Sequence, residues 1–227
     1  LEDALGGTHT VQLSGVSKSV KYYIRTIRTV DEPIGGLIHR IVGVDGMTYA
    51  DHGLNGQRIL IVDIGGQVSS MCRASKDGDV DYSTAESFRL GIRDVLKSFR
   101  AELKTRYPGF RSDVSESKVR QALRTGVYSG GGKTIDISAA RDAACQRIVN
   151  QIRNLYEDNM GGPLEYDHIL LTGGGGALLE DQLRKVLAHD SIVRADFNVD
   201  EMFLANIRGA AKMFINILTS SGKWVAA

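Results

Sequence analysis

The sequence predicts an α/β protein, in which strands and long helices alternate along the chain. The continuous aliphatic runs at 58–64 ("RILIVDI") and 166–171 ("YDHILL") are typical of buried strands. Two long segments, 87–107 and 138–156, repeat apolar residues at helical spacing and predict amphipathic helices. Because these strands and helices alternate in order, we expect helices layered against a sheet.

Composition excludes several classes of protein. The chain has 227 residues, 42% of them hydrophobic and 24% charged, with a net charge of +1, as in a soluble globular protein. We therefore expect no direct nucleic-acid binding. No apolar run reaches the roughly 20 residues that span a bilayer. Cys72 and Cys145 fit no metal-ligand spacing, which favours free thiols in a reducing compartment and hence a cytoplasmic protein.

The first part of the chain is predicted to be extended. Residues 9–30 alternate apolar and polar side chains and predict two strands, with turn residues at 14–18 between them. The segment "DEPIGG" (31–36) contains a proline and two glycines and is predicted to end the second strand. The short apolar stretch "LIHRIVGV" (37–44) then favours a helix.

A hairpin and the first long helix follow the 58–64 strand. Residues 67–83 predict the hairpin, with an Asp-Gly turn in "KDGD" (76–79). The helix is predicted from Ser87 to Tyr107, where Pro108-Gly109 ends it.

The remaining elements are mostly helical. Residues 115–126 predict a helix closed by Gly126, and 127–138 a short hairpin. Ser138 is predicted to cap the next helix, which runs to about Tyr156. A strand, a glycine turn and a helix follow in 166–187, and the last helix is predicted at 199–218.

Two familiar nucleotide-binding motifs are not present. "SGGGKT" (129–134) ends like a Walker A loop, but the first glycine of that motif would fall on Val127. The segment also follows a helix and leads to "IDIS", so a surface hairpin is the better interpretation. No G-x-G-x-x-G follows the first strand of a βαβ unit, which argues against a Rossmann-type dinucleotide binder.

Asp63 and the residues after it predict a metal–nucleotide site. A carboxylate at the end of a buried strand is costly unless it has a partner. Two glycines directly after it let consecutive N–H groups form an anion-binding nest. Because a carboxylate repels a phosphate unless a cation lies between them, we expect Mg²⁺ held by Asp63 through water. Phosphate oxygens would then bind the amides of Gly65, Gly66, Gln67 and Val68. The alternative is that Asp63 only caps a turn.

A second glycine run, 173–176, joins the later strand to its helix. Glycine lets a flat or anionic ligand approach the backbone, and the start of a helix offers N–H groups without partners. A purely structural role in packing is the alternative for this run. Two such turns at the ends of two strands predict a cleft that holds a nucleotide between them.

Several segments resemble one protein superfamily. "ILIVDIGGQVSS" (59–70) is similar to the second phosphate motif of actin, Hsp70 and the sugar kinases, and "ILLTGGGGALL" (169–179) to their adenosine motif. "ANIRGAAKMF" (205–214) resembles the following helix of bacterial actins. "EPIGG" (32–36) resembles the inter-domain segment of plasmid-segregation actins of the ParM/StbA type, and "SFRLGIRDVL" (87–96) a helix start near the sugar and base.

The resemblance covers most of 10–215 and implies a ribonuclease H-like, actin-type fold. Such a fold has a mixed central sheet flanked by helices, here with a helical subdomain inserted at about 87–160. Residues 1–36 would be the end of an N-terminal actin-like domain and the connection to a C-terminal nucleotide-binding domain at 37–227. The family's first phosphate hairpin has no counterpart before Thr10, so we expect this chain to be largely the C-terminal half.

The resemblance also implies roles for single residues. Glu32 falls where a residue faces the attacking water, so Glu32 and Asp63 are the candidate catalytic residues. Gly91 falls at a close approach to the nucleotide, and the adenine would lie against the backbone of Gly173, Gly174 and Gly175. The loop departs from the family at Gln67-Val68-Ser69-Ser70, where Val68 lacks the usual hydroxyl and Ser70 replaces an acid. Backbone binding survives these changes, whereas the case for side-chain contacts is weakened.

The function implied is that of an actin-like protein that binds ATP or ADP with Mg²⁺ and self-associates into nucleotide-dependent filaments. Its role would be plasmid or phage DNA segregation through a DNA-binding adaptor, or a related cytoskeletal one. We expect ATPase activity in the longer protein and weak or absent activity in this piece. The alternatives are a non-polymerising scaffold or adaptor, which the altered loop favours, and a small-molecule kinase. The kinase would need a catalytic base in an acceptor pocket, for which the sequence offers no clear candidate.

Overall fold

The computed structural model describes residues 6–12, 19–24, 27, 31–48, 53–75, 79–107, 110, 114–130 and 132–221. The chain divides into two compact units, 1–31 and 32–227. In the first unit, β1 (Gly7–Gln12) pairs antiparallel with β2 (Ser19–Ile24). These are the two strands predicted within 9–30, and the turn predicted at 14–18 lies outside the described residues. The domain boundary predicted at residue 36 stays a prediction.

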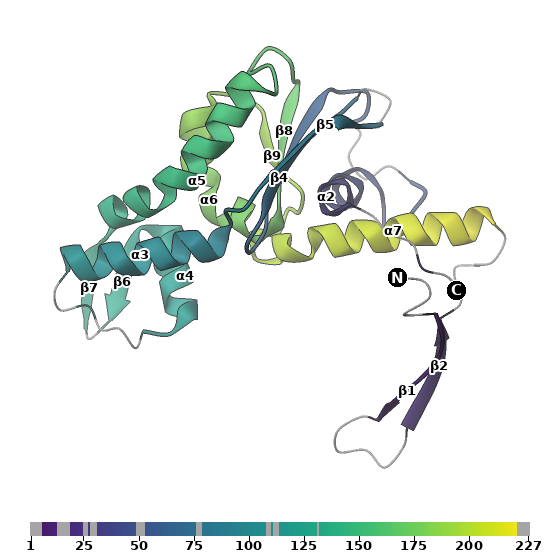
Figure 1. Ribbon diagram of the computed structural model, residues 1–227, viewed down its shortest axis with the longest axis horizontal. Coiled ribbons are helices and arrows are strands. Elements are labelled where there is room, and N and C mark those ends of the chain that lie inside the picture. Colours follow the sequence, from purple (N-terminus) through teal and green to yellow (C-terminus); the bar gives the residue numbers. More distant parts are fainter. Residues whose placement is uncertain are drawn as a thin grey trace. The chain divides into compact units, whose positions relative to one another are not determined.

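The larger unit is built on a five-stranded mixed sheet with the order β5-β4-β3-β8-β9 (Figure 1). Its strands are β3 (Ile59–Ile64), β4 (Ser69–Ala74), β5 (Val80–Phe88), β8 (His168–Thr172) and β9 (Ile192–Arg194). Strand β4 runs antiparallel to both β3 and β5, whereas β8 runs parallel to both β3 and β9. The sheet confirms the predicted α/β class and mixed central sheet. The hairpin joining β4 to β5 also agrees, although its turn at 76–78 is not among the described residues.

Helices cover both faces of this sheet (Figure 1). One face carries α3 (Ile92–Arg106), α5 (Ser138–Asp158) and α6 (Gly173–Leu187), which enclose the larger hydrophobic core. The other face carries α2 (Glu32–Ile41) and α7 (Ala205–Ser220), with a smaller core between them and the sheet. A short 3-10 helix, η1 (Val199–Leu204), precedes α7.

The alternation of side chains along β3 decides which core each residue joins. Leu60, Val62 and Ile64 belong to the larger core, and Ile59 and Ile61 to the smaller one. Because successive side chains of a strand point to opposite faces, the next position in the second set falls on Asp63. The carboxylate therefore lies on the α2/α7 face, where the pattern would otherwise place a third aliphatic residue.

The segment between α3 and α5 forms a helix and a hairpin. Helix α4 (Glu116–Thr125) ends at Gly126, whose φ of 70° is left-handed and suits a glycine cap. Strands β6 (Val127–Gly130) and β7 (Lys133–Asp136) then pair antiparallel. This confirms the surface hairpin at "SGGGKT" and the rejection of a P-loop there. The predicted stop at Pro108-Gly109 lies outside the described residues.

Three predicted boundaries were wrong. The helix predicted from Leu37 already begins at Glu32, so "EPIGG" forms its start, because Pro33 is tolerated in a first turn and tertiary packing favours the two glycines that follow. The helix predicted from Ser87 begins at Ile92, since β5 continues to Phe88 in its pairing with β4. The predicted glycine turn at 173–176 is already the first turn of α6.

Helices α2 and α7 cross in backbone contact. A Cβ atom on Gly209 would overlap the carbonyl oxygen of Gly35, and one on Gly35 would overlap the carbonyl oxygen of Asn206. Farther along α7, Nζ of Lys212 donates hydrogen bonds to the carbonyl oxygens of His39 (2.7 Å) and Val42 (2.6 Å) at the end of α2. The two helices thus form one rigid pair over the smaller core.

This crossing predicts that Gly209→Ala destabilises the fold. Alanine is the better helix former by about 1 kcal/mol. The overlap of its Cβ with a backbone carbonyl outweighs this gain, and we expect a net loss of about 1–3 kcal/mol in the free energy of unfolding. Urea denaturation measures the change. Ala211→Ser, at an exposed position of the same helix, should change stability by only about 0.5 kcal/mol, and an equal effect of both substitutions would contradict the prediction.

Candidate functional site

The two glycine-rich segments singled out in the sequence meet at one edge of the sheet. Strands β3 and β8 are parallel neighbours, with Asp63 opposite Thr172. Their carboxyl ends therefore lie side by side, where ligands commonly bind in open α/β sheets. A Cβ atom on Gly173 would lie 2.5 Å from Oδ1 of Asp63 and 2.6 Å from the carbonyl oxygen of Ile64. The structure thus brings the start of α6 directly against the candidate metal-binding carboxylate.

Asp63 is held by a short chain of polar side chains. Asp63 is only 3% exposed, and Nδ2 of Asn206 donates a hydrogen bond of 3.3 Å to Oδ1 of Asp63. Oγ1 of the fully buried Thr172 in turn donates to Oδ1 of Asn206 at 2.6 Å. Sequence reasoning did not single out Asn206 or Thr172. The available signal was the polar Thr172 directly after the aliphatic run 169–171, and the asparagine of the 205–214 segment, which was quoted as a motif without a role for Asn206.

The charge of Asp63 is unfavourable in this environment. Burial raises its pKa from 3.8 to about 6, although the hydrogen bond from Asn206 lowers the pKa. The negative charge of Glu32 raises it further. Glu32 is the exposed first residue of α2, so this helix brings the second predicted catalytic carboxylate within electrostatic range of the first. Burial, and to a smaller extent the charge of Glu32, therefore disfavours the ionised form of Asp63.

The turn at 65–68 has backbone amides that no acceptor occupies among the described residues. The N–H of Gly65 donates to the carbonyl oxygen of Val68 at 3.0 Å and is therefore occupied. The carbonyl oxygens of Gly65 and Gly66 accept hydrogen bonds of 3.0 Å from the N–H groups of Ile92 and Arg93 at the start of α3. In a trans peptide the N–H points away from the C=O. Within the described part of the chain, no acceptor is bonded to the amides of three exposed turn residues, Gly66, Gln67 and Val68.

Gly91 has a structural role at this turn. It precedes α3, and a Cβ atom there would lie 2.6 Å from the nitrogen of Gln67 and 2.6 Å from the carbonyl carbon of Gly66. Only glycine lets the start of α3 approach the turn so closely. The predicted place of Gly91 near the sugar and base stays a prediction, and its observed close approach is to the 65–68 turn.

Packing accounts for some glycines of α6 but not for all. Gly173 has a φ of 73°, and a Cβ on Gly175 would lie 2.8 Å from the carbonyl oxygen of Ile64. Both positions therefore require glycine for structural reasons, in agreement with the alternative that this glycine run serves packing. Gly174 differs, because it is partly exposed and its Cβ would meet only Cβ of Phe203, at an ordinary 3.4 Å. Its backbone is the part of the run that is open to a ligand.

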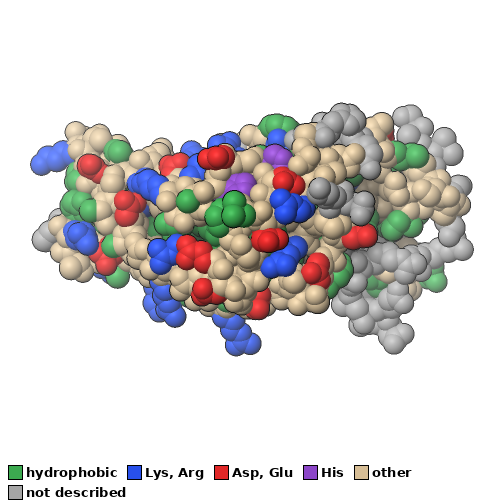
Figure 2. Space-filling model, turned by 90° about the horizontal axis from the view of Figure 1, so that it is seen from above, with side chains coloured by type: hydrophobic (Ala, Val, Ile, Leu, Met, Phe, Trp, Pro, Cys, Tyr) green, Lys and Arg blue, Asp and Glu red, His purple; other side chains and the backbone are tan. Residues whose placement is uncertain are grey.

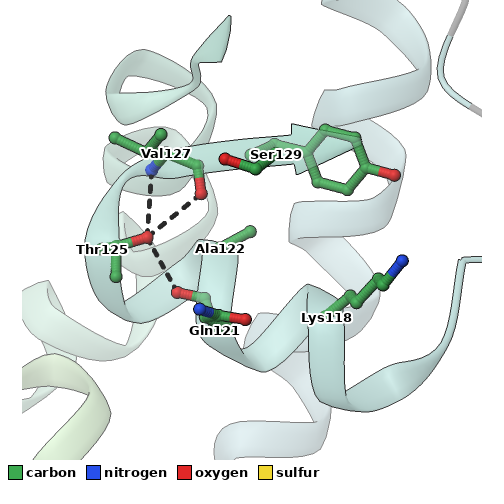
Figure 3. Close-up of a pocket in the computed structure, with 7 residues that line it drawn as sticks. Lys118, Gln121, Ala122, Thr125, Val127 and Ser129 are labelled. Atoms are coloured by element: carbon green, nitrogen blue, oxygen red, sulfur yellow. Dashed lines mark hydrogen bonds between the residues drawn. The ribbon is translucent and has the colours of Figure 1, made fainter. Parts of the chain in front are cut away.

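A separate cavity lies in the segment between α3 and α5. It has a volume of about 240 Å³ and is formed by α4 and β6 (Figure 3). Oγ1 of Thr125 donates to the carbonyl oxygens of Gln121 (3.0 Å) and Val127 (3.1 Å), so the walls of the cavity are bonded to each other. None of the predicted site residues lines it.

Three further observations concern the surface, metal ligands and membrane-spanning helices. On the face shown in Figure 2, acidic and basic side chains are interspersed rather than gathered by sign. Over the described ranges, no group of three or more His, Cys, Asp or Glu side chains could hold a metal ion. Nor does any helix in those ranges have the length and apolar character needed to span a membrane.

The raised pKa of Asp63 predicts a specific pH dependence of stability. Between about pH 4 and pH 6 the folded state binds more protons at Asp63 than the unfolded state, so the free energy of unfolding falls as the pH rises. Relative to Asp63→Asn, wild type should lose about 3 kcal/mol across this window, at about 1.4 kcal/mol per pKa unit. Urea denaturation at a series of pH values measures this. Asn206→Ala should extend the decline to higher pH, and a difference that does not vary with pH would contradict the assignment.

Comparisons with solved structures identify the fold. The archaeal actin homologue Ta0583 matches with a TM-score of 0.72 at 15% identity, over 95% of this chain and 63% of that one. ParM of Bacillus thuringiensis with AMPPNP matches with a TM-score of 0.65 at 15% identity, over 96% and 63%. Apo psk41 ParM gives 0.65 at 13% identity, over 98% and 59%. The chain thus spans about 60% of the length of these relatives.

The match to a sequence family is more specific. No curated protein sequence matches this chain significantly. The family described as archaeal actin homologue MreB-like, C-terminal, matches residues 61–185, which include Asp63, the 65–68 turn and the glycine run of α6. The five-stranded mixed sheet and the actin-homologue structures agree with that match. The chain therefore belongs to the family of archaeal MreB-like actin homologues, within the actin-like ATPase superfamily.

Proposed function

We propose that the edge formed by Asp63, the 65–68 turn and the start of α6 binds ATP, and that the protein hydrolyses it. One observation carries this proposal: a buried carboxylate, three amides without acceptors and the partly exposed backbone of Gly174 lie together at neighbouring strand ends. The structure of B. thuringiensis ParM with ATP and that of Ta0583 in complex with ADP support the choice of ligand.

The donor set at this edge fits Mg²⁺. Burial and the charge of Glu32 both raise the pKa of Asp63, and a divalent cation near Asp63 would stabilise its ionised form. Mg²⁺ binds through one or two carboxylates and keeps several waters, so it does not need the three-ligand cluster that the described residues lack. Asp63 would hold the water shell of the ion, which supplies charge neutralisation for the phosphates.

The protein's own groups would act by positioning. The amides of Gly66, Gln67 and Val68 would bind phosphate oxygens, whereas the amide of Gly65 is already engaged by Val68. Glu32 would orient or activate the attacking water, and the open backbone of Gly174 would admit the adenine. Phosphoryl transfer depends mainly on such positioning and on charge stabilisation.

Assembly into filaments is part of the same proposal. Because the chain covers about 63% of the length of Ta0583, the remaining part of such a fold would supply the opposite wall of the cleft. Closure of the cleft on nucleotide would change the affinity for the next subunit, and head-to-tail contacts that do not close a ring generate open filaments. We propose a cytoplasmic role in plasmid or phage DNA segregation through a DNA-binding adaptor, or a related cytoskeletal role.

One observation favours a second candidate, a non-polymerising scaffold. Val68 places an apolar side chain, 49% exposed, on the proposed phosphate turn. A turn that binds protein rather than phosphate would account for this exposure.

Light scattering distinguishes these functions. On addition of ATP and Mg²⁺, we expect the protein expressed from its complete gene to scatter more light within minutes, and EDTA to prevent the increase. Pelleting by centrifugation provides an independent measure. Bound ATP without any polymer would support the scaffold, and ADP release that requires an added sugar would support the kinase.

Substitution of the two carboxylates tests the site. Asp63→Ala should abolish ATP hydrolysis, because it removes the group that holds the metal's water shell. Glu32→Ala should slow hydrolysis while ATP affinity by calorimetry stays unchanged, since it acts on the water. Glu157→Ala, an exposed acid of α5, serves as the control and should hydrolyse ATP like wild type. Wild-type turnover in both site variants would remove the assignment.

A further inference from the structure

We propose that Phe203 is the platform on which the base of the bound nucleotide stacks. This inference rests on the nucleotide-binding function proposed above and adds to it the side chain that binds the base. Nothing in the glycine motifs themselves specifies such a side chain.

Phe203 lies beside the one open glycine of α6. It belongs to η1, and its Cβ is the atom nearest to where a Cβ on Gly174 would stand, 3.4 Å away. Phe203 is 62% exposed, and Gly174 is partly exposed. A single exposed apolar residue is ordinary on a protein surface. The informative feature is that Phe203 lies directly beside Gly174, where the backbone is not covered by a side chain.

The 3-10 helix holds Phe203 firmly. The neighbouring residue, Met202, is fully buried, and its Cε would lie 3.2 Å from a Cβ on Gly176, so η1 is seated on the first turn of α6. Glu201 forms an ion pair with Arg208 of α7, and its N–H donates to the carbonyl oxygen of Asn198 at 3.0 Å. Anchored on both sides, η1 presents the ring without the ordering cost of a free loop.

The order of groups along the edge assigns the base to this end. Asp63 lies one residue before the end of β3 and borders the 65–68 turn on one side. On its other side it contacts Gly173, which leads to Gly174 and then to Phe203. Amides and carboxylates suit the phosphates and their cation, whereas an exposed aromatic ring suits a flat base. A nucleotide whose phosphates bind the 65–68 turn would therefore extend its base over Gly174 toward Phe203.

Stacking on a ring gives affinity without reading the base. The ligand class that follows is a nucleoside triphosphate with a large aromatic base, because a purine offers more surface for stacking than a pyrimidine. Inorganic tripolyphosphate, which has no base, would use only the phosphate end.

The experiment compares these two ligands by calorimetry in the protein expressed from its complete gene. Phe203→Ala should weaken ATP binding by roughly ten- to a hundredfold, while the affinity for tripolyphosphate stays unchanged. Phe203→Tyr, which keeps the ring, should retain the wild-type ATP affinity. Phe214→Ala removes another exposed phenylalanine, 40% exposed on α7, and should bind both ligands like wild type.

The possible failures are distinguishable. Unchanged ATP affinity in Phe203→Ala would overturn the stacking role and leave the nucleotide site in place. Equal losses for ATP and tripolyphosphate would show that Phe203 supports the fold of the site, which also overturns its role as a platform. A wild-type protein that binds tripolyphosphate and ATP equally would have no base site, and one that binds neither ligand would overturn the proposed function as well.

Discussion

The site depends on one buried interaction, the hydrogen bond from Asn206 to the carboxylate of Asp63. The alternation of β3 points Asp63 into an apolar layer, where an ionised group is costly. The amide of Asn206 offsets part of that cost and is itself oriented by the hydroxyl of Thr172. Strands β3 and β8 and helix α7 each supply one of these three hydrogen-bonded side chains. If the sheet edge and α7 moved apart, the buried carboxylate of Asp63 would therefore lose its hydrogen-bond donor.

The crossing of α2 and α7 makes this interaction possible. A Cβ on Gly36 would lie 2.9 Å from Oδ1 of Asn206, so the absence of a side chain at Gly36 leaves room for the amide. The same helix begins with Glu32, whose charge raises the pKa of Asp63. Close packing of α2 and α7 therefore has two effects on Asp63. It positions the amide of Asn206, which favours the ionised carboxylate, and it brings Glu32 near, whose charge disfavours the ionised carboxylate. This arrangement supports our proposal that the site binds a cation.

Backbone groups rather than side chains define the rest of the edge. The start of α3 binds the carbonyl oxygens of Gly65 and Gly66, and the amides of residues 66–68 have no acceptor among the described residues. This division explains how the turn can tolerate Gln67 and Val68, because neither the carbonyl contacts to α3 nor the outward amides require a particular side chain. The one side chain that we add to the site, Phe203, comes from outside all the glycine motifs.

The sequence by itself determined the class of fold and the two glycine-rich strand ends, because both are local properties. An aliphatic run ending in Asp63 and a strand leading to glycines can be read from neighbouring residues, and their approach at one edge follows once β3 and β8 are parallel. Tertiary structure alone decided the functions of Gly35, Gly91 and Gly209, since each glycine is required by a partner far along the chain. It also decided that "EPIGG" is helical, and it brought Asn206 to Asp63 across more than a hundred residues of sequence. Local propensity cannot reveal contacts of this kind, because they exist only after the helices pack on the sheet.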